Sequence, residues 1–208
     1  HGTDTLEKTA YFLNIVAKSD KLVILIGAMC PASAMSADGP VNALNAVNLV
    51  ASKDAKGRGV MIAMNDVING ARDVQKSNTL RVDTFQCPEL GYRGYFENGR
   101  HVFYNAAIRK HTKDTEFEVS ELKDLPHVDI IYSHVNDDDK VAEAAVANGV
   151  KGIVHAGTGN GSIHENAEAA LYVAAKKGIV VVRAARVPSG PTIESAEAWD
   201  NPVLFMQE

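Results

Sequence analysis

Thr3 and Asp4 are the first residues of the sequence that could do chemistry, and they stand directly before a segment with helical periodicity. Thr and Asp are favoured N-cap residues, and a cap would stabilise the helix by about 1 kcal/mol. Asp4 followed by Glu7 also resembles a capping box. The alternative is functional: a hydroxyl beside the N–H groups of a helix N-terminus could attack a carbonyl or activate water, because those groups would stabilise an oxyanion.

The functional interpretation of Thr3 requires a base, because a threonine hydroxyl is too weakly acidic to attack unaided. A lysine whose pKa is lowered by burial could serve as that base. Our candidate is Lys76, which lies in a polar stretch after an apolar segment with strand character. Taken alone, a lysine in such a stretch is more often a solvated surface charge, and nothing near it in the sequence selects it.

A glycine-rich stretch, Gly157-Thr158-Gly159-Asn160-Gly161-Ser162, is another place where a ligand could bind. It fails as a dinucleotide fingerprint, because the third glycine of G-x-G-x-x-G would stand at position 162, where Ser162 is found. A tight turn into a helix and a loop that binds a small ligand both remain open. The sequence has no H-E-x-x-H, paired C-x-x-C or G-x-S-x-G motif, and its seven histidines show no spacing typical of metal ligands.

The composition excludes several classes of protein. With 46% hydrophobic residues over 208 positions, the chain is neither a disordered tail nor a fibre. Its formal net charge of −5 argues against nucleic acid as a partner. No apolar run approaches the roughly 20 residues of a transmembrane helix. Two cysteines, Cys30 and Cys87, do not make a disulfide framework and could be free or bridged.

The elements that must position these residues alternate between strands and helices, which predicts an α/β fold with largely parallel sheets. Asn69-Gly70 and Asn98-Gly99 are turn signals, and the second predicts a β-hairpin over residues 91–105. In the helix that begins near Pro40, Leu44, Val47 and Ala51 form the expected apolar stripe. The expected strands are 22–26, 60–64, 128–132, 152–155 and 179–183, and the other expected helices are 6–17, 138–148 and 165–177.

We predict two α/β domains. Residues 1–105 form the first, residues 106–126 a linker, and residues 127–208 a smaller second domain. Ligands of such folds bind at the carboxyl ends of the strands, where the loops at residues 27–31 and 156–162 lie.

Taken together, these residues resemble the bacterial type II L-asparaginase family of asparaginases and glutaminase-asparaginases. His1-Gly2-Thr3-Asp4-Thr5-Leu6 resembles the family's second signature. Further family motifs follow in the family's order over nearly the whole chain: Gly27-Ala28-Met29, Ser36-Ala37-Asp38-Gly39, Met64-Asn65-Asp66, Lys76-Ser77-Asn78, Arg109-Lys110-His111-Thr112, 156–162 and Val182-Arg183.

The resemblance implies an enzyme that hydrolyses L-asparagine to L-aspartate and ammonia, in some members also L-glutamine, without a metal or organic cofactor. It implies a catalytic triad of Thr3, Lys76 and Asp4. Thr3 activates or positions water or the substrate carbonyl, and its backbone N–H can join the oxyanion hole. Lys76 tunes the proton on Thr3, and Asp4 orients Lys76 and holds the substrate α-ammonium group.

Other implied substrate contacts lie on later segments and on a second subunit. The carbonyl of Ala28 receives the substrate amide N–H, and Ser162 and Glu197 complete the pocket from an adjacent subunit. The resemblance therefore also implies a homo-oligomer, typically a tetramer with shared active sites, and a periplasmic or secreted location. It places neither Cys30 nor Cys87 in the family's bridge, so we expect free thiols.

The sequence departs from the family in ways that bear on activity. The Thr-Gly-Gly-Thr motif, which holds the threonine usually taken as the nucleophile, does not occur in it. The match weakens around Glu197. We therefore expect an incomplete first domain, a truncated second domain and a chain that is inactive by itself. A catalytically inactive amino-acid-binding module of the same fold and a nucleotide-binding domain are the alternatives. The preference between asparagine and glutamine stays open, because one methylene contributes only about 1–3 kcal/mol to discrimination.

Overall fold

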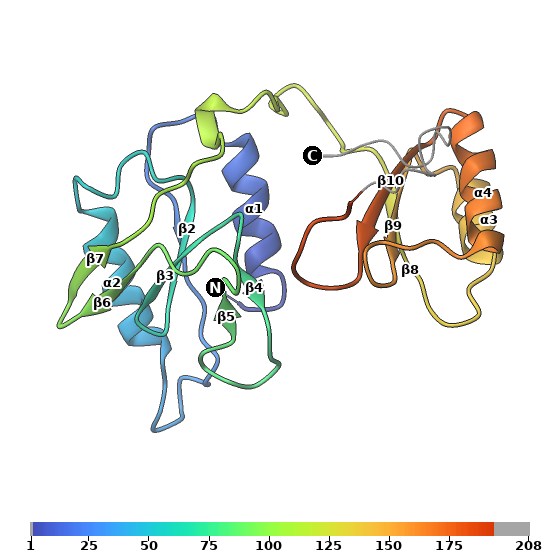
Figure 1. Ribbon diagram of the computed structural model, residues 1–208. Coiled ribbons are helices and arrows are strands. Elements are labelled where there is room, and N and C mark those ends of the chain that lie inside the picture. The colour runs from blue at the N-terminus through green and yellow to red at the C-terminus, as the bar shows by residue number, and fades with distance from the viewer. Residues whose placement is uncertain (1, 194–208) are drawn as a thin grey trace. The chain divides into compact units, whose positions relative to one another are not determined.

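The structure, a computed structural model, describes residues 2–193, so Glu197 lies outside the described residues. The chain divides into two compact units, residues 1–121 and 122–208 (Figure 1). Each unit has its own sheet and is described by itself. In the described residues, no helix has the length and apolar character needed to cross a membrane.

The first unit is built on a mixed five-stranded sheet in the order β1-β2-β3-β6-β7. The pair β1–β2 is parallel and the other pairs are antiparallel. The predicted hairpin is confirmed as β6 and β7, with Asn98 and Gly99 at positive φ in its turn. The strands are β1 (Ile24–Leu25), β2 (Met61–Met64), β3 (Val67–Gly70), β6 (Gly94–Glu97) and β7 (Arg100–Phe103), and a separate ladder joins β4 (Gln75–Lys76) to β5 (Phe85–Gln86).

Strand β2 is buried on both faces, which explains its continuous apolar run. Ile62 and Met64 belong to one core cluster, together with residues of α1 (Leu6–Val16). Met61 and Ala63 belong to another, together with residues of α2 (Gly39–Val50). The two helices therefore cover opposite faces of the sheet, as Figure 1 shows.

The predicted turn at Asn69-Gly70 is wrong, because both residues lie in β3 and pair with β2. The turn falls instead on Asn65 and Asp66, whose φ angles are 52° and 56°. Asn69 is fully buried. Gly70 is required by packing, since a Cβ there would lie 2.5 Å from Nε of Arg93.

The predicted apolar stripe of α2 is also wrong. Leu44 and Val47 are 57% and 62% exposed, and Ala51 is exposed as well. The helix turns a different face to the sheet, and its buried residues are Asn42, Asn45 and Leu49. Two asparagines face inward because their side chains bind neighbouring loops: Asn42 donates to the carbonyl of Gly27, and Asn45 donates to Asp66 Oδ1 in the β2–β3 turn.

The second unit holds a three-stranded parallel sheet in the order β10-β9-β8. Two helices pack on one face of it, over a core that includes Ile153 and Leu171 (Figure 1). The alternation predicted from residue 128 onward is confirmed, and so is the α/β class. The elements are β8 (Val128–Tyr132), α3 (Lys140–Ala147), β9 (Gly152–Gly157), α4 (Glu165–Lys176) and β10 (Val180–Ala185), and a short 3-10 helix, η1 (Thr112–Asp114), precedes them in the first unit.

Candidate active site

Thr3, Asp4 and Lys76 meet in the first unit, although 73 positions separate Thr3 from Lys76. Lys76 Nζ donates a hydrogen bond to Thr3 Oγ1 at 3.0 Å and lies 3.9 Å from Asp4 Oδ1. The Lys76 side chain is only 20% exposed, whereas that of Asp4 is 99% exposed. The structure thus places a partly buried cation against a hydroxyl, with an open carboxylate beside them.

The capping interpretation of Thr3 and Asp4 is wrong. Helix α1 begins at Leu6 and its N-cap is Thr5, which makes no side-chain cap hydrogen bond. Thr3 and Asp4 therefore lie before the cap position. The Thr3 hydroxyl has the Lys76 ammonium group as a partner, so capping does not account for a threonine here.

Lys76 and Thr3 are each held by their own backbone surroundings. Lys76 ends β4 and pairs with the buried Phe85 of β5, so a ladder fixes its backbone. Thr3 packs against the backbone at Gly27, just after β1, where a Cβ would come within 2.9 Å of Thr3 Cγ2. Only glycine permits this close approach, which brings Thr3 beside the loop that carries Ala28.

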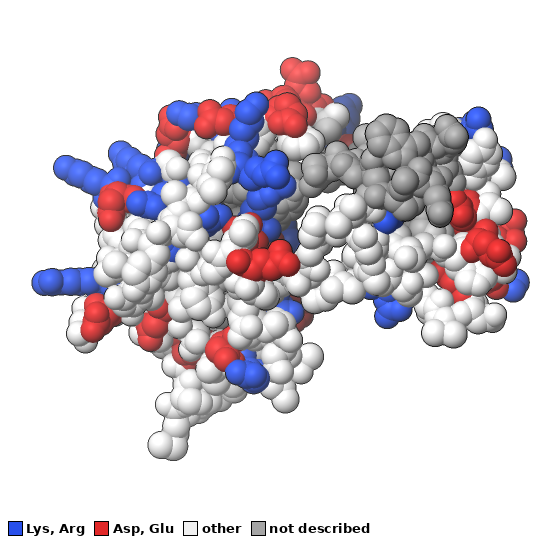
Figure 2. Space-filling model, in the orientation of Figure 1, with Lys and Arg blue, Asp and Glu red and all other residues white. Residues whose placement is uncertain are grey.

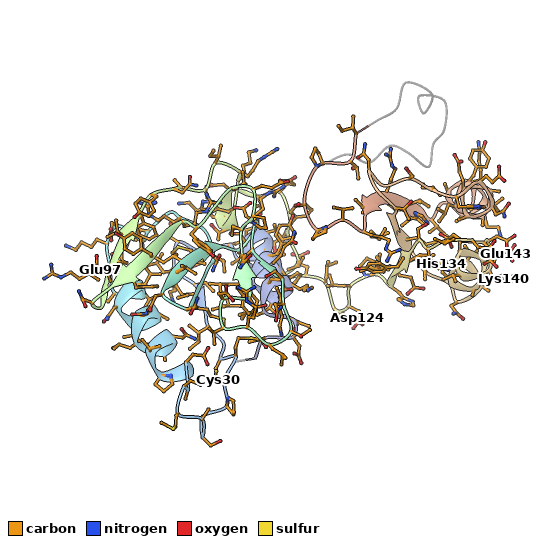
Figure 3. The ribbon with its side chains drawn as sticks, turned by 60° about the horizontal axis from the view of Figure 1, so that its bottom comes forward. Cys30, Glu97, Asp124, His134, Lys140 and Glu143 are labelled. Carbon is orange, nitrogen blue, oxygen red and sulfur yellow. The ribbon has the colours of Figure 1, made fainter. Side chains whose placement is uncertain are left out.

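Asp38 fixes the loop around Ala28 from the start of α2. Its carboxylate accepts hydrogen bonds from the backbone N–H groups of Met29 and Cys30, both at 2.9 Å. Cys30 lies on the loop that precedes α2 (Figure 3). Carboxylate–amide bonds of this kind are charge-assisted and stronger than neutral ones, so the loop is held firmly.

Asn42 ties the same loop to the β2–β3 turn. Its Nδ2 donates to the carbonyl of Gly27 at 3.0 Å and to Asp38 Oδ2 at 3.2 Å, and its Oδ1 accepts from Asn65 N at 3.0 Å. Asn42 is 1% exposed. No sequence motif had indicated a role for Asp38 or Asn42. One feature of the sequence could have indicated these contacts: asparagines stand at positions 42 and 45 of one predicted helix, on the face that the structure buries. A buried amide must find hydrogen-bond partners.

The arrangement of Thr3, Lys76 and Asp4 could stabilise a negative charge and bind a cation. Because the Lys76 ammonium group donates to Thr3 Oγ1, it stabilises negative charge that develops on this oxygen when the hydroxyl proton leaves. The exposed carboxylate of Asp4 is open to a cationic group of a ligand. In the described residues, no cluster of side chains is suited to hold a metal ion.

Ser162 lies in the second unit, on the glycine-rich loop after β9. Ser162 and Thr158 exchange two backbone hydrogen bonds, of 2.8 and 3.1 Å. Arg183 donates to the carbonyls of Gly161 at 2.9 Å and Asn160 at 2.7 Å, which clamps the loop from β10. The tight-turn interpretation is thus confirmed, and it leaves Ser162 exposed.

Comparison with known proteins identifies the relatives of this chain. Residues 1–110 match the family described as "Asparaginase, N-terminal", and residues 127–203 match "Glutaminase/Asparaginase C-terminal domain". L-asparaginase 2 of Bacillus subtilis (strain 168) is 51% identical over 190 residues, which cover 91% of this chain and 50% of the relative. The "Probable L-asparaginase periplasmic" of Haemophilus influenzae is 46% identical over 206 residues, covering 99% of this chain and 59% of that protein.

A solved structure supports the same relationship. The probable cytoplasmic L-asparaginase from Campylobacter jejuni superposes with a TM-score of 0.91 at 52% identity, covering 95% of this chain and 65% of the other. The chain thus spans half to three fifths of the length of the two curated relatives described above. The Haemophilus protein is named as periplasmic, whereas the Campylobacter protein is named as cytoplasmic.

Proposed function

This chain belongs to the asparaginase family, and on that premise we propose that the protein hydrolyses the side-chain amide of L-asparagine to L-aspartate and ammonia, with L-glutamine as a second candidate substrate. The contact of Lys76 with Thr3 and Asp4 carries this proposal. It brings together a hydroxyl, a cation and a carboxylate, which are the three groups of the triad that the resemblance implies. No metal or organic cofactor takes part in the proposed reaction.

In the proposed reaction, an oxygen nucleophile adds to the side-chain carbonyl carbon, and the carbonyl becomes an oxyanion. Thr3 activates or positions water or the carbonyl, and its backbone N–H joins the oxyanion hole. Lys76 donates a hydrogen bond to Thr3 Oγ1 and so tunes how readily the hydroxyl gives up its proton. The proton that the nucleophile gives up passes to the amide nitrogen, the oxyanion re-forms the carbonyl as the C–N bond breaks, and the nitrogen leaves as ammonia. If the nucleophile was a hydroxyl of the protein, water then hydrolyses the acyl-enzyme ester and releases the acid.

Recognition of a free amino acid requires opposite charges on the protein, because the substrate is a zwitterion. Asp4 binds the α-ammonium group, and its full exposure supports that role. The Ala28 carbonyl receives the amide N–H, from a loop that Asp38 and Asn42 fix. We propose that Ser162 and Glu197 complete the pocket from a neighbouring subunit, which makes the protein a homo-oligomer, a tetramer by family habit. A periplasmic or secreted location stays a prediction.

Paired substitutions test the triad in the full-length protein. Thr3→Val and Lys76→Met should each lower kcat by about 10³-fold or more, because members of a catalytic unit are costly to remove. Thr5→Val and Lys53→Met are matched controls outside the site, and they should leave kcat nearly unchanged. If ammonia release by Thr3→Val stayed within tenfold of the parent protein, the assignment of Thr3 would be refuted.

A catalytically inactive amino-acid-binding module is the second candidate. It is favoured by one observation: Asp4 and the Ala28 loop are in place, while the sequence contains no Thr-Gly-Gly-Thr motif. Calorimetric binding of L-aspartate, together with no ammonia release from L-asparagine in the full-length protein, would establish the binding module instead of the enzyme.

A further inference from the structure

A cavity of the first unit lies at the end of α1 that is farther from Thr3. It has a volume of about 360 Å³ and is lined by Asn14 of α1, by the end of β3 with the turn that follows it, and by residues 107–111. That volume lies in the range of pockets that hold small organic molecules, about 300–1,000 Å³. Its lining includes none of Thr3, Asp4, Ala28 and Lys76, so it is distinct from the proposed active site.

Positive charge dominates the lining of this cavity. Five lysine and arginine side chains contribute to it: Arg58, Arg72, Arg93, Arg109 and Lys110. The lining has one carboxylate, that of Asp73, and it already pairs with Arg93 at 2.5 Å. The whole chain carries a formal net charge of −5, so this concentration of cations runs against the overall balance. Figure 2 shows lysines and arginines over the upper part of the first unit, with aspartates and glutamates among them.

Arg58 is held in place without a carboxylate partner among the described residues. Its Nε donates to the carbonyl of Asp54 at 2.7 Å and its Nη1 to that of Asn105 at 3.0 Å, and its guanidinium lies 3.8 Å from the centre of the Phe103 ring. Two neutral carbonyls and an aromatic ring orient the guanidinium, but they do not neutralise its positive charge. A charge fixed in this way loses little conformational entropy when it binds an anion.

Arg109 and Lys110 bring two more uncompensated charges on an exposed segment. Within residues 2–193, neither side chain makes an ion pair or a hydrogen bond. Val60, Leu90 and Ala107 add apolar surface to the same cavity. The cavity therefore combines unpaired cations with an apolar wall.

We propose that this cavity binds a small organic anion with two or more negative charges, either a phosphate ester or a dicarboxylate. Arginine suits both groups, because its planar fork of N–H donors matches carboxylate and phosphate oxygens. A monovalent anion would satisfy only one of the unpaired cations, so charge number is the basis of selection. The apolar wall contacts the carbon skeleton of the ligand.

Isothermal titration calorimetry at low ionic strength tests this site. The ligands are pyrophosphate and succinate, with acetate as the monovalent control. Saturable binding of pyrophosphate alone would assign the site to phosphate esters, and binding of succinate alone to dicarboxylates. Absence of saturable binding by both would overturn the proposal, and so would equal binding of acetate.

Substitutions locate the binding. Arg109→Gln with Lys110→Gln should weaken binding about tenfold or more, since each unit charge near an anion contributes roughly a factor of five even in a water-like medium. Lys53→Gln with Lys56→Gln removes two exposed cations elsewhere on the same unit and should change binding less than about twofold. Equal losses in the two double variants would show non-specific attraction and refute the site.

Two further variants separate this site from folding and from the active site. Arg109→Lys with Lys110→Arg keeps both charges and should bind within about threefold of the parent protein. Lys76→Met should bind the anion unchanged, because Lys76 does not line the cavity. Loss of binding in Lys76→Met would place the anion at the Thr3 site and overturn the proposal.

Discussion

Asn42→Asp is the sharpest test of how the Ala28 loop is held. The substitution keeps the shape of the side chain and replaces the Nδ2 donor by a carboxylate oxygen. That oxygen then faces two acceptors, the Gly27 carbonyl and Asp38 Oδ2, at the distances of 3.0 and 3.2 Å that the amide now spans. Two hydrogen bonds are lost and two repulsive contacts replace them.

The size of the effect follows from these contacts. Each lost hydrogen bond contributes about 1 kcal/mol, and two carboxylates at this separation repel by an amount on the order of 5 kcal/mol at an effective dielectric constant of about 20. Protonation of the new carboxyl group limits this repulsion. We therefore expect the free energy of unfolding of the first unit to fall by about 3–5 kcal/mol at neutral pH.

The stability of the Asn42→Asp protein should also depend on pH, in a direction that follows from the pKa of the new carboxyl group. Burial beside Asp38 raises the pKa of the new carboxyl group in the folded protein above its unfolded value of about 3.9. The folded state then binds more protons than the unfolded state between the two pKa values, so stability falls as pH rises through this window. The destabilisation relative to the parent protein should accordingly shrink as the pH is lowered toward about 5.

Urea unfolding followed by circular dichroism measures this loss, and hydrogen exchange at the amides of Met29 and Cys30 shows whether the loop opens. Asn48→Asp is the matched control on the same helix, because Asn48 makes one longer bond of 3.3 Å to Gly99 O on a partly exposed face. We expect that control to cost less than about 1 kcal/mol. An Asn42→Asp protein as stable as the control, with no difference in pH dependence, would refute the reasoning.

Three other predictions concern single residues. Gly27→Ala should lower kcat/KM of the full-length protein by about a hundredfold, because the new Cβ would lie 2.9 Å from Thr3 Cγ2 and displace the hydroxyl; activity near that of the parent would contradict this. Burial raises the pKa of Cys87 to about 11, so at pH 8 a maleimide should label Cys30 and leave Cys87 unmodified until the protein unfolds. Burial lowers the pKa of His155 below its unfolded value of about 6.5, so the unfolded state binds more protons and the second unit should lose stability as pH falls below that value. His155→Gln should reduce this slope in urea titrations at several pH values.

Local patterns predicted many of the elements because the relevant signals lie within short windows. The continuous apolar run at residues 60–64 indicated a strand buried on both faces, and β2 is one. Asn98-Gly99 predicted the turn of the β6–β7 hairpin. The second unit followed from the alternation of apolar runs with helical periodicity. The structure contains both cysteines as the expected free thiols.

The same local rules failed where residues far away in the sequence determine the local conformation or the buried face of an element. Asn69-Gly70 carries a turn signal but lies in a strand, because both residues pair with Ile62 and Met61 of β2. The stripe of α2 was misplaced, because Asn42 and Asn45 face inward to bind loops from other parts of the chain. The short β4–β5 ladder was missed, because two-residue strands have no periodicity to detect.

The sequence by itself determined the fold class and, through the order of its motifs, the family. It could not distinguish Lys76 from a solvated lysine, or Thr3 from a helix cap, because each interpretation is locally satisfactory. Only the tertiary structure distinguishes these interpretations, since it places Lys76 Nζ 3.0 Å from Thr3 Oγ1, although the two residues lie 73 positions apart in the chain. Hydrogen bonding falls off steeply with distance, so the contact between Lys76 and Thr3 depends on packing that no local pattern encodes.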